Sequence, residues 1–172
     1  MKQHKTAIII SIVLFCLAVA AAIGLSTSAN RALNSAEPSA MITLAFPDTD
    51  PGASPAVAIL TSKTDDADTY AFAAENGTDL ICPVPKGTYM LTVVPPVNQD
   101  GSTYAIWSED IDINTANTPV TVTCDSISRS KAGLAYYNQL YTLVDAAFAH
   151  TDSDETKDLL QQSKDMLSIA MH

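Results

Sequence analysis

The sequence predicts a mainly β protein with a C-terminal α-helical part: an N-terminal transmembrane helix, a seven-strand antiparallel β-sandwich and a helical hairpin. Three observations predict this order. An uncharged apolar run opens the chain, short runs of strand-forming residues separated by turn residues follow, and apolar residues at helical spacing close it. These patterns divide the chain into a membrane segment at 1–25, a spacer at 26–40, a β-sandwich at 41–126 and a helical hairpin at 127–172.

The N-terminal segment has the features of a signal anchor. Lys2 and Lys5 precede residues 7–25, which carry no charge and would span about 28 Å as a helix, close to the thickness of the hydrocarbon core. A cleaved signal peptide is the alternative, although its apolar region is usually shorter, about 7–15 residues. The two lysines favour a cytoplasmic N-terminus. The rest of the chain is therefore expected to be extracytoplasmic, held at the cell membrane by a single pass or secreted after cleavage.

The exported part is strongly acidic. The chain contains nine Lys and Arg and 19 Asp and Glu residues, for a formal net charge of -10. Two of the nine basic residues, Lys2 and Lys5, belong to the N-terminal tip, so the rest of the chain has seven basic and 19 acidic residues, a net charge of -12. Such a domain repels phosphate backbones, and nucleic acid is therefore not expected as a partner.

The middle of the chain alternates strand formers with turns. Asn76-Gly77 and Asp100-Gly101 supply the positive φ angles that tight hairpins require. Seven strands are expected, at 41–46, 56–61, 69–73, 79–82, 88–94, 104–113 (with an interruption) and 119–124. Short strands at this spacing predict a small antiparallel sandwich or barrel.

Two cysteines of the exported part are expected on the core side of their strands. Cys82 shares a face with Leu80, and Cys124 shares a face with Val120 and Val122, because alternate residues of a strand point the same way. Disulfides are permitted outside the cytoplasm. A Cys82–Cys124 bond is therefore predicted, worth roughly 4 kcal/mol in the chain-entropy model. Two buried free thiols are the alternative.

The last part of the chain has a helical period. Its first apolar stripe has the spacing 3, 4, 3, 4 and consists of Leu134, Tyr137, Tyr141, Val144 and Phe148. Residues 151–154 break the pattern and supply a capping box for a second helix. The resulting hairpin packs on its own domain or presents its aromatic stripe to a partner. In the second case Tyr137, Tyr141 and Phe148 are the candidate partner-binding residues.

No catalytic constellation, metal site or cofactor site is predicted. The three histidines, His4, His150 and His172, are not placed beside a nucleophile, and no phosphate-binding glycine loop or Cys-x-x-Cys pair occurs. Asp65, Asp66 and Asp68 are the best candidates for a Ca²⁺ loop, but a solvated acidic surface is the favoured interpretation of these residues. Trp107 and Tyr104 are interpreted as core residues, with a sugar-stacking platform as the alternative.

The stretch LICPVPKGTYMLTVVPP at residues 80–96 resembles the Leu-x-Pro-x-Gly-x-Tyr-x-Leu signature of CNA-B/SpaA-type and carboxypeptidase-regulatory-like modules of Gram-positive surface proteins. Pro85, Gly87, Tyr89 and Leu91 occupy the matching positions. The resemblance covers about half the chain and implies a prealbumin-like β-sandwich. Many members carry an isopeptide bond from a lysine near the first strand to an asparagine on the last. Residues 41–46 contain no lysine and 118–124 no asparagine, so this bond is expected to be absent, with the cysteine pair as a substitute.

These expectations favour a non-enzymatic structural or protein-binding module of the cell surface or envelope. The membrane, through the N-terminal helix, and a protein or envelope component are the expected partners. The alternative is an accessory subunit of a membrane enzyme or transporter that docks through its C-terminal helices. An enzyme in its own right is the least favoured class, because nothing selects a catalytic pair among the 19 acidic residues.

Overall fold

The computed structural model describes residues 38–64, 68–75 and 79–172. The predicted transmembrane segment, most of the spacer, and Asp65 and Asp66 of the candidate Ca²⁺ loop lie outside these residues. Within the described ranges, no helix combines the length and the apolar character needed to cross a bilayer.

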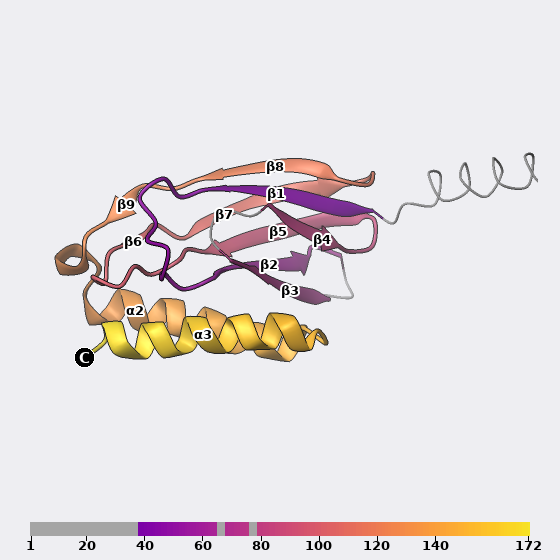
Figure 1. The fold of residues 1–172 in the computed structure, drawn as a ribbon. Helices are drawn as coiled ribbons and strands as arrows, with labels where there is room; N and C mark the ends of the chain where they lie inside the picture. Colours follow the sequence, from indigo (N-terminus) through magenta and orange to yellow (C-terminus); the bar gives the residue numbers. More distant parts are fainter. Residues whose placement is uncertain (1–37, 65–67, 76–78) are drawn as a thin grey trace, which may run out of the picture. The chain divides into compact units, whose positions relative to one another are not determined.

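The described domain has three layers: two β-sheets packed face to face, and two helices on the outer side of one of them (Figure 1). One sheet has the strand order β4-β1-β8 and the other β3-β2-β5-β7, while β6 and β9 form a separate ribbon. The strands are β1 (Ser39–Ala45), β2 (Ala56–Ser62), β3 (Thr69–Ala74), β4 (Leu80–Pro83), β5 (Gly87–Val94), β6 (Thr103–Tyr104), β7 (Trp107–Ile113), β8 (Thr118–Thr123) and β9 (Ser126–Ile127). The helices are α2 (Arg129–Ala147), the 3₁₀ turn η1 (Phe148–His150) and α3 (Asp154–Ala170).

The strand positions are confirmed, but the purely antiparallel topology is wrong. Each predicted run contains a strand, and the run at 104–113 is interrupted into β6 and β7 as expected. However, β1 and β8 pair in parallel, from Ala40 opposite Thr118 to Ala45 opposite Thr123. The physical reason is that β7 and β8 follow each other in sequence but belong to different sheets, so β8 returns beside β1 in the same direction.

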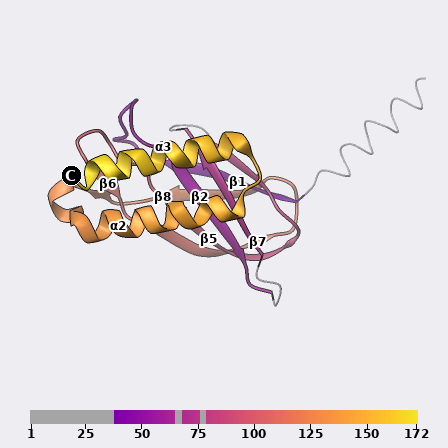
Figure 2. The same cartoon turned by 90° about the horizontal axis from the view of Figure 1, so that it is seen from below.

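Strand β2 connects the two hydrophobic cores. Its Ala58 and Leu60 face the sandwich core, whereas Val57 and Ile59 face the helices. A strand covered on both faces reads as a continuous apolar run rather than an alternation, and β2 has this pattern. Figure 2 shows α2 and α3 side by side across this sheet. Their largest buried residues in this layer are Tyr137, Leu140, Val144, Leu160 and Leu167.

The helical pair is confirmed, with one shift in the stripe of α2. Gly133 has φ 65° and ψ 168°, which interrupts the helix and rotates its first turn relative to the rest. Leu134, directly after this break, is 59% exposed, while Leu140 is fully buried. The start of α3 agrees with the predicted capping signal, because the Ser153 side chain accepts the N–H of Thr156 at 3.2 Å.

The predicted Cys82–Cys124 bond does not form, and both residues are free thiols. Cys82 on β4 lies opposite Ala40 at the start of β1, whereas Cys124 follows Thr123, which lies opposite Ala45 at its end. This register separates the thiols by about 20 Å along the strands. A disulfide requires Cα atoms within about 7 Å. Both cysteines do pack against the sandwich core, as their alternation predicted, but at opposite ends of the sheet.

Alkylation should distinguish these two thiols. Burial is the main cause that raises the pKa of both, to about 11 for Cys124, and Cys82 is fully buried. In the folded protein at pH 8, Cys82 is therefore expected not to react with iodoacetamide. Cys124 is expected to react slowly, and its rate of alkylation should increase as the pH rises. Intact mass before and after denaturation measures this. A native mass 2 Da below that of the reduced protein, together with no reaction of Cys82 or Cys124 in denaturant, would contradict the free thiols and support the predicted disulfide.

Candidate functional site

A concave feature among the described residues is a groove between α3 and the end of β3, here called the α3 groove. One cavity of about 630 Å³ is lined by Ala73, Ala74, Glu75, Glu155, Asp158, Leu159 and Gln162. A second cavity of about 490 Å³ is lined by Pro51, Gly52, Ala53, Pro55, Glu75 and Gln162. Because Glu75 and Gln162 line both cavities, we treat them as one continuous groove.

The wall of the groove formed by α3 follows from helix periodicity. Glu155, Asp158 and Gln162 are three and four residues apart and therefore lie on one side of the helix. The opposite side of α3 is fixed in the core by Leu160 and Leu167, which are almost completely buried. The polar wall is thus mounted on a firmly packed helix.

The loop at 50–55 completes the groove and is tied to the rest of the domain. The buried Oγ of Ser163 on α3 donates to the carbonyl of Pro55 at 3.0 Å, which holds this loop beside Gln162. The Oγ of Ser54 accepts the N–H of Val97 at 2.9 Å, and the Ser54 N–H donates to the Val97 carbonyl at 2.9 Å. The groove is therefore a preformed surface between two anchored segments.

The described lining of the groove is acidic and otherwise mainly apolar. Its described lining contains three carboxylates and one amide among small aliphatic and proline side chains, and it includes no serine, cysteine, histidine or lysine. In the part of the chain that the structure describes, no three His, Cys, Asp or Glu residues are arranged to hold a metal ion. Carboxylates in such a setting attract cationic groups.

The residues predicted to bind a partner, Tyr137, Tyr141 and Phe148, are engaged inside the domain. Tyr137 is 2% exposed, and its hydroxyl donates to the carbonyl of Gly101. The Nζ of Lys164 lies 5.1 Å from the ring centroid of Tyr141 and 5.2 Å from that of Phe148. The buried part of the stripe therefore packs on its own domain, which was one of the two interpretations left open, and the burial of Tyr137 contradicts its predicted partner role.

Lys164 is held over these rings by an ion pair. Its Nζ donates to the carboxylate of Asp145 at 2.6 Å, and this hydrogen bond is the main cause that raises the pKa of Lys164. The ammonium group thus lies between a carboxylate and two aromatic rings, which is a favourable cation–π arrangement.

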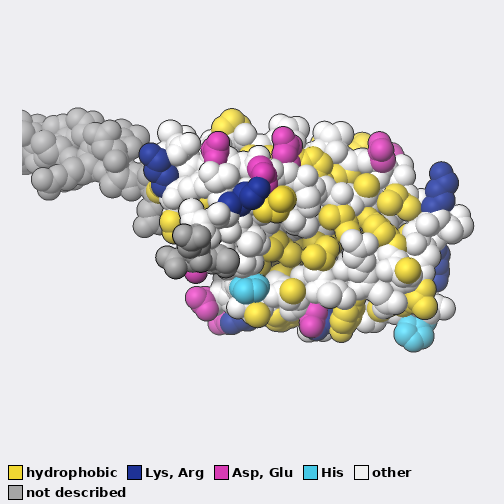
Figure 3. Space-filling model, turned by 180° about the vertical axis from the view of Figure 1, so that it is seen from behind, with side chains coloured by type: hydrophobic (Ala, Val, Ile, Leu, Met, Phe, Trp, Pro, Cys, Tyr) yellow, Lys and Arg dark blue, Asp and Glu magenta, His cyan; other side chains and the backbone are white. Residues whose placement is uncertain are grey.

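The other side of the domain carries an apolar face. Figure 3 shows apolar side chains gathered across the middle of this side, with most charged groups near its edges. Half-buried apolar residues of α2 and of the loop before β7 pack against the core between the helices and their sheet, among them Ile106, Tyr136 and Leu143. The Tyr136 hydroxyl donates to the Tyr104 carbonyl at 2.6 Å, and burial raises the pKa of Tyr136.

Tyr104 is a core residue, as the sequence indicated. It is 1% exposed, and its ring lies 4.9 Å from that of Phe46. Trp107 is half-buried and packs against the sandwich core, which agrees with the interpretation of both residues as core residues.

Comparisons of the chain with protein-family models, curated proteins and solved structures gave no match. The similarity of residues 80–96 to the CNA-B/SpaA-type modules therefore stays a prediction. The sequence reasoning missed the α3 groove. Glu155 and Asp158 were visible at helical spacing, but no local pattern places them opposite Glu75, 80 residues earlier in the chain.

Proposed function

We propose that the protein is a membrane-anchored, extracytoplasmic and non-enzymatic binding module of the cell surface or envelope, and that the α3 groove is its binding site for another protein. The observation that carries the binding role is the groove itself. It is large, preformed and lined by side chains suited to recognition rather than to nucleophilic or metal chemistry. The charge-free run at 7–25 behind Lys2 and Lys5 supports the anchor.

The pairing of the first and last strands of the sandwich supports the CNA-B-like class. The family's isopeptide bond joins its first strand to its last, and β1 and β8 are neighbours in this domain. Here the starts of these strands are connected by hydrogen bonds instead. The Oγ of Ser39 accepts the N–H of Asn117 at 2.9 Å and lies 3.4 Å from Asn117 Oδ1. This contact joins the same two strands without a covalent bond.

The apolar face favours a second candidate, an accessory subunit of a membrane enzyme or transporter. Tyr136 and Leu143 are half-buried apolar residues of α2, and an apolar surface surrounded by charged groups, as on the side shown in Figure 3, is typical of protein interfaces. The two candidate functions use different sides of the domain, so the position at which a partner crosslinks distinguishes them.

Site-specific photo-crosslinking in the membrane fraction of the native host tests both candidates. A photoreactive residue at Gln162 is expected to give a discrete adduct, whereas the same residue at its exposed neighbour Gln161 gives none, because only Gln162 lines the groove. Adducts at Leu143 but not at Gln162 would support the accessory-subunit candidate. Absence of adducts at both positions, or a protein found only in the medium and starting near residue 30, would contradict the anchored binding module.

A further inference from the structure

We propose that the occupant of the α3 groove is an extended segment of a protein partner with Lys or Arg at alternate positions. This inference rests on the proposed binding function and adds the chemical class of the partner.

The shape of the groove suits an extended chain. Its two cavities meet at Glu75 and Gln162 and so form a long surface rather than a single round pocket. Between the carboxylates the lining is aliphatic, with Ala73, Leu159 and Pro55 among its members. Small aliphatic side chains leave room for a backbone and for the methylene stems of long basic side chains.

The spacing of the carboxylates suits alternate basic residues. Glu155 and Asp158 are separated by about 4.5 Å along the axis of α3. Side chains on one side of an extended chain recur about every 6.6 Å. Lysine and arginine stems are flexible enough to bridge this difference, so neighbouring basic residues on one side of the segment can reach Glu155 and Asp158.

The charge of the groove is not neutralised by the lysines of α3. Lys157 lies 3.8 Å from the carboxylate of Asp154, and Lys164 pairs with Asp145. Among the described residues that line the groove, none is basic. A cationic segment is therefore the occupant whose charge complements this surface, whereas an acidic or phosphorylated segment would be repelled.

Binding of a labelled short peptide to the full-length protein in phosphatidylcholine nanodiscs tests the inference. The probe alternates lysine with alanine, and fluorescence anisotropy gives its Kd. The double substitution Glu155→Gln/Asp158→Asn is expected to weaken binding about fivefold, and added salt should weaken binding to the unmodified protein. The matched control is Glu109→Gln/Asp125→Asn, which removes the same charge from exposed positions outside the groove. It should change Kd less than twofold.

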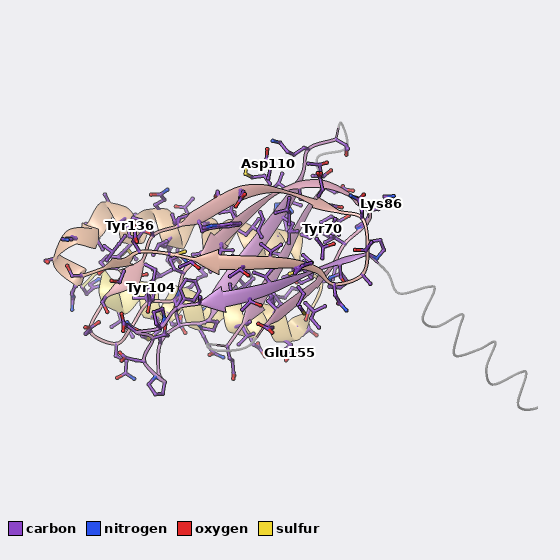
Figure 4. All side chains as sticks on the ribbon, turned by 90° about the horizontal axis from the view of Figure 1, so that it is seen from above. Tyr70, Lys86, Tyr104, Asp110, Tyr136 and Glu155 are labelled. Carbon is purple, nitrogen blue, oxygen red and sulfur yellow. The ribbon has the colours of Figure 1, made fainter. Side chains whose placement is uncertain are left out.

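The control lies well away from the groove. Figure 4 shows Asp110, the neighbour of Glu109, and Glu155 on opposite sides of the domain. Equal weakening by the two double variants would mean diffuse attraction to an acidic protein and would overturn the inference, as would the absence of peptide binding. If a glutamine–alanine peptide bound as tightly as the lysine peptide and Gln162→Trp blocked both, groove binding would stand and the basic preference would be wrong. The crosslinking at Gln162 tests the binding function independently of either peptide.

Discussion

Replacement of Tyr137 by alanine is expected to lower the free energy of unfolding by about 3–4 kcal/mol. Its ring is buried between α2 and the β3-β2-β5-β7 sheet, where removal leaves a cavity that the surrounding β-strands cannot readily fill. The same change also removes the hydrogen bond from its hydroxyl to the carbonyl of Gly101. Urea denaturation of the detergent-solubilised full-length protein, followed by circular dichroism, measures the effect.

Tyr137→Phe is the matched control for this experiment. It keeps the ring and removes only the hydroxyl, so a loss of about 1 kcal/mol is expected. Unchanged stability in Tyr137→Ala, together with loss of the crosslinked partner at Gln162, would contradict the packing role and return Tyr137 to the partner-binding residues.

Asn98→Ala is expected to lower the free energy of unfolding by about 3 kcal/mol. Asn98 is 6% exposed. Its Oδ1 accepts the N–H of Asp50 at 2.9 Å, and its Nδ2 donates to the carbonyl of Asp48 at 3.1 Å and to Ser102 Oγ at 2.9 Å. Alanine removes all three hydrogen bonds. It leaves the carbonyl of Asp48 and the N–H of Asp50 without their side-chain partner.

The loss should be concentrated in the loop that also forms one wall of the groove. Amide hydrogen exchange at Asp50 is expected to accelerate in Asn98→Ala, because that N–H loses its acceptor. Asn138→Ala on the exposed side of α2 is the matched control and should change stability by less than about 0.5 kcal/mol. Equal effects of the two substitutions would show that the Asn98 network does not stabilise the fold.

The two faces of α3 separate the residues that stabilise the domain from those of the proposed binding surface. Leu160, Ser163 and Leu167 fix one side of the helix to the sheet and to the loop at 50–55, while Glu155 and Asp158 stand on the other. Substitutions on the groove side are therefore expected to change binding with little loss of stability. This separation makes the proposed site accessible to mutational tests.

Local structure was largely predictable from the sequence. The strand at 88–94 and the start of α3 at Ser153 depend on neighbouring residues: a turn before alternating apolar side chains, and a capping hydroxyl before a helical stripe. The apolar stripe of α2 predicted a packed helix for the same reason. Two details departed from it: Leu134 is exposed, and the helix is interrupted at Gly133, whose positive φ the apolar period does not reveal.

The sequence by itself determined the acidic character of the chain beyond its N-terminal tip, the apolar N-terminal run, the order of strands and helices, and the inward faces of Cys82 and Cys124. These properties depend on composition and on contacts within a few residues. Only the tertiary structure decided that β1 and β8 run in parallel, that the two cysteines lie at opposite ends of their sheet, and that Glu75 meets Glu155 and Asp158 in one groove. The reason is that local periodicity decides which face of a strand or helix is buried, whereas strand partners and grooves depend on residues far apart in the chain, whose spacing carries no local signal.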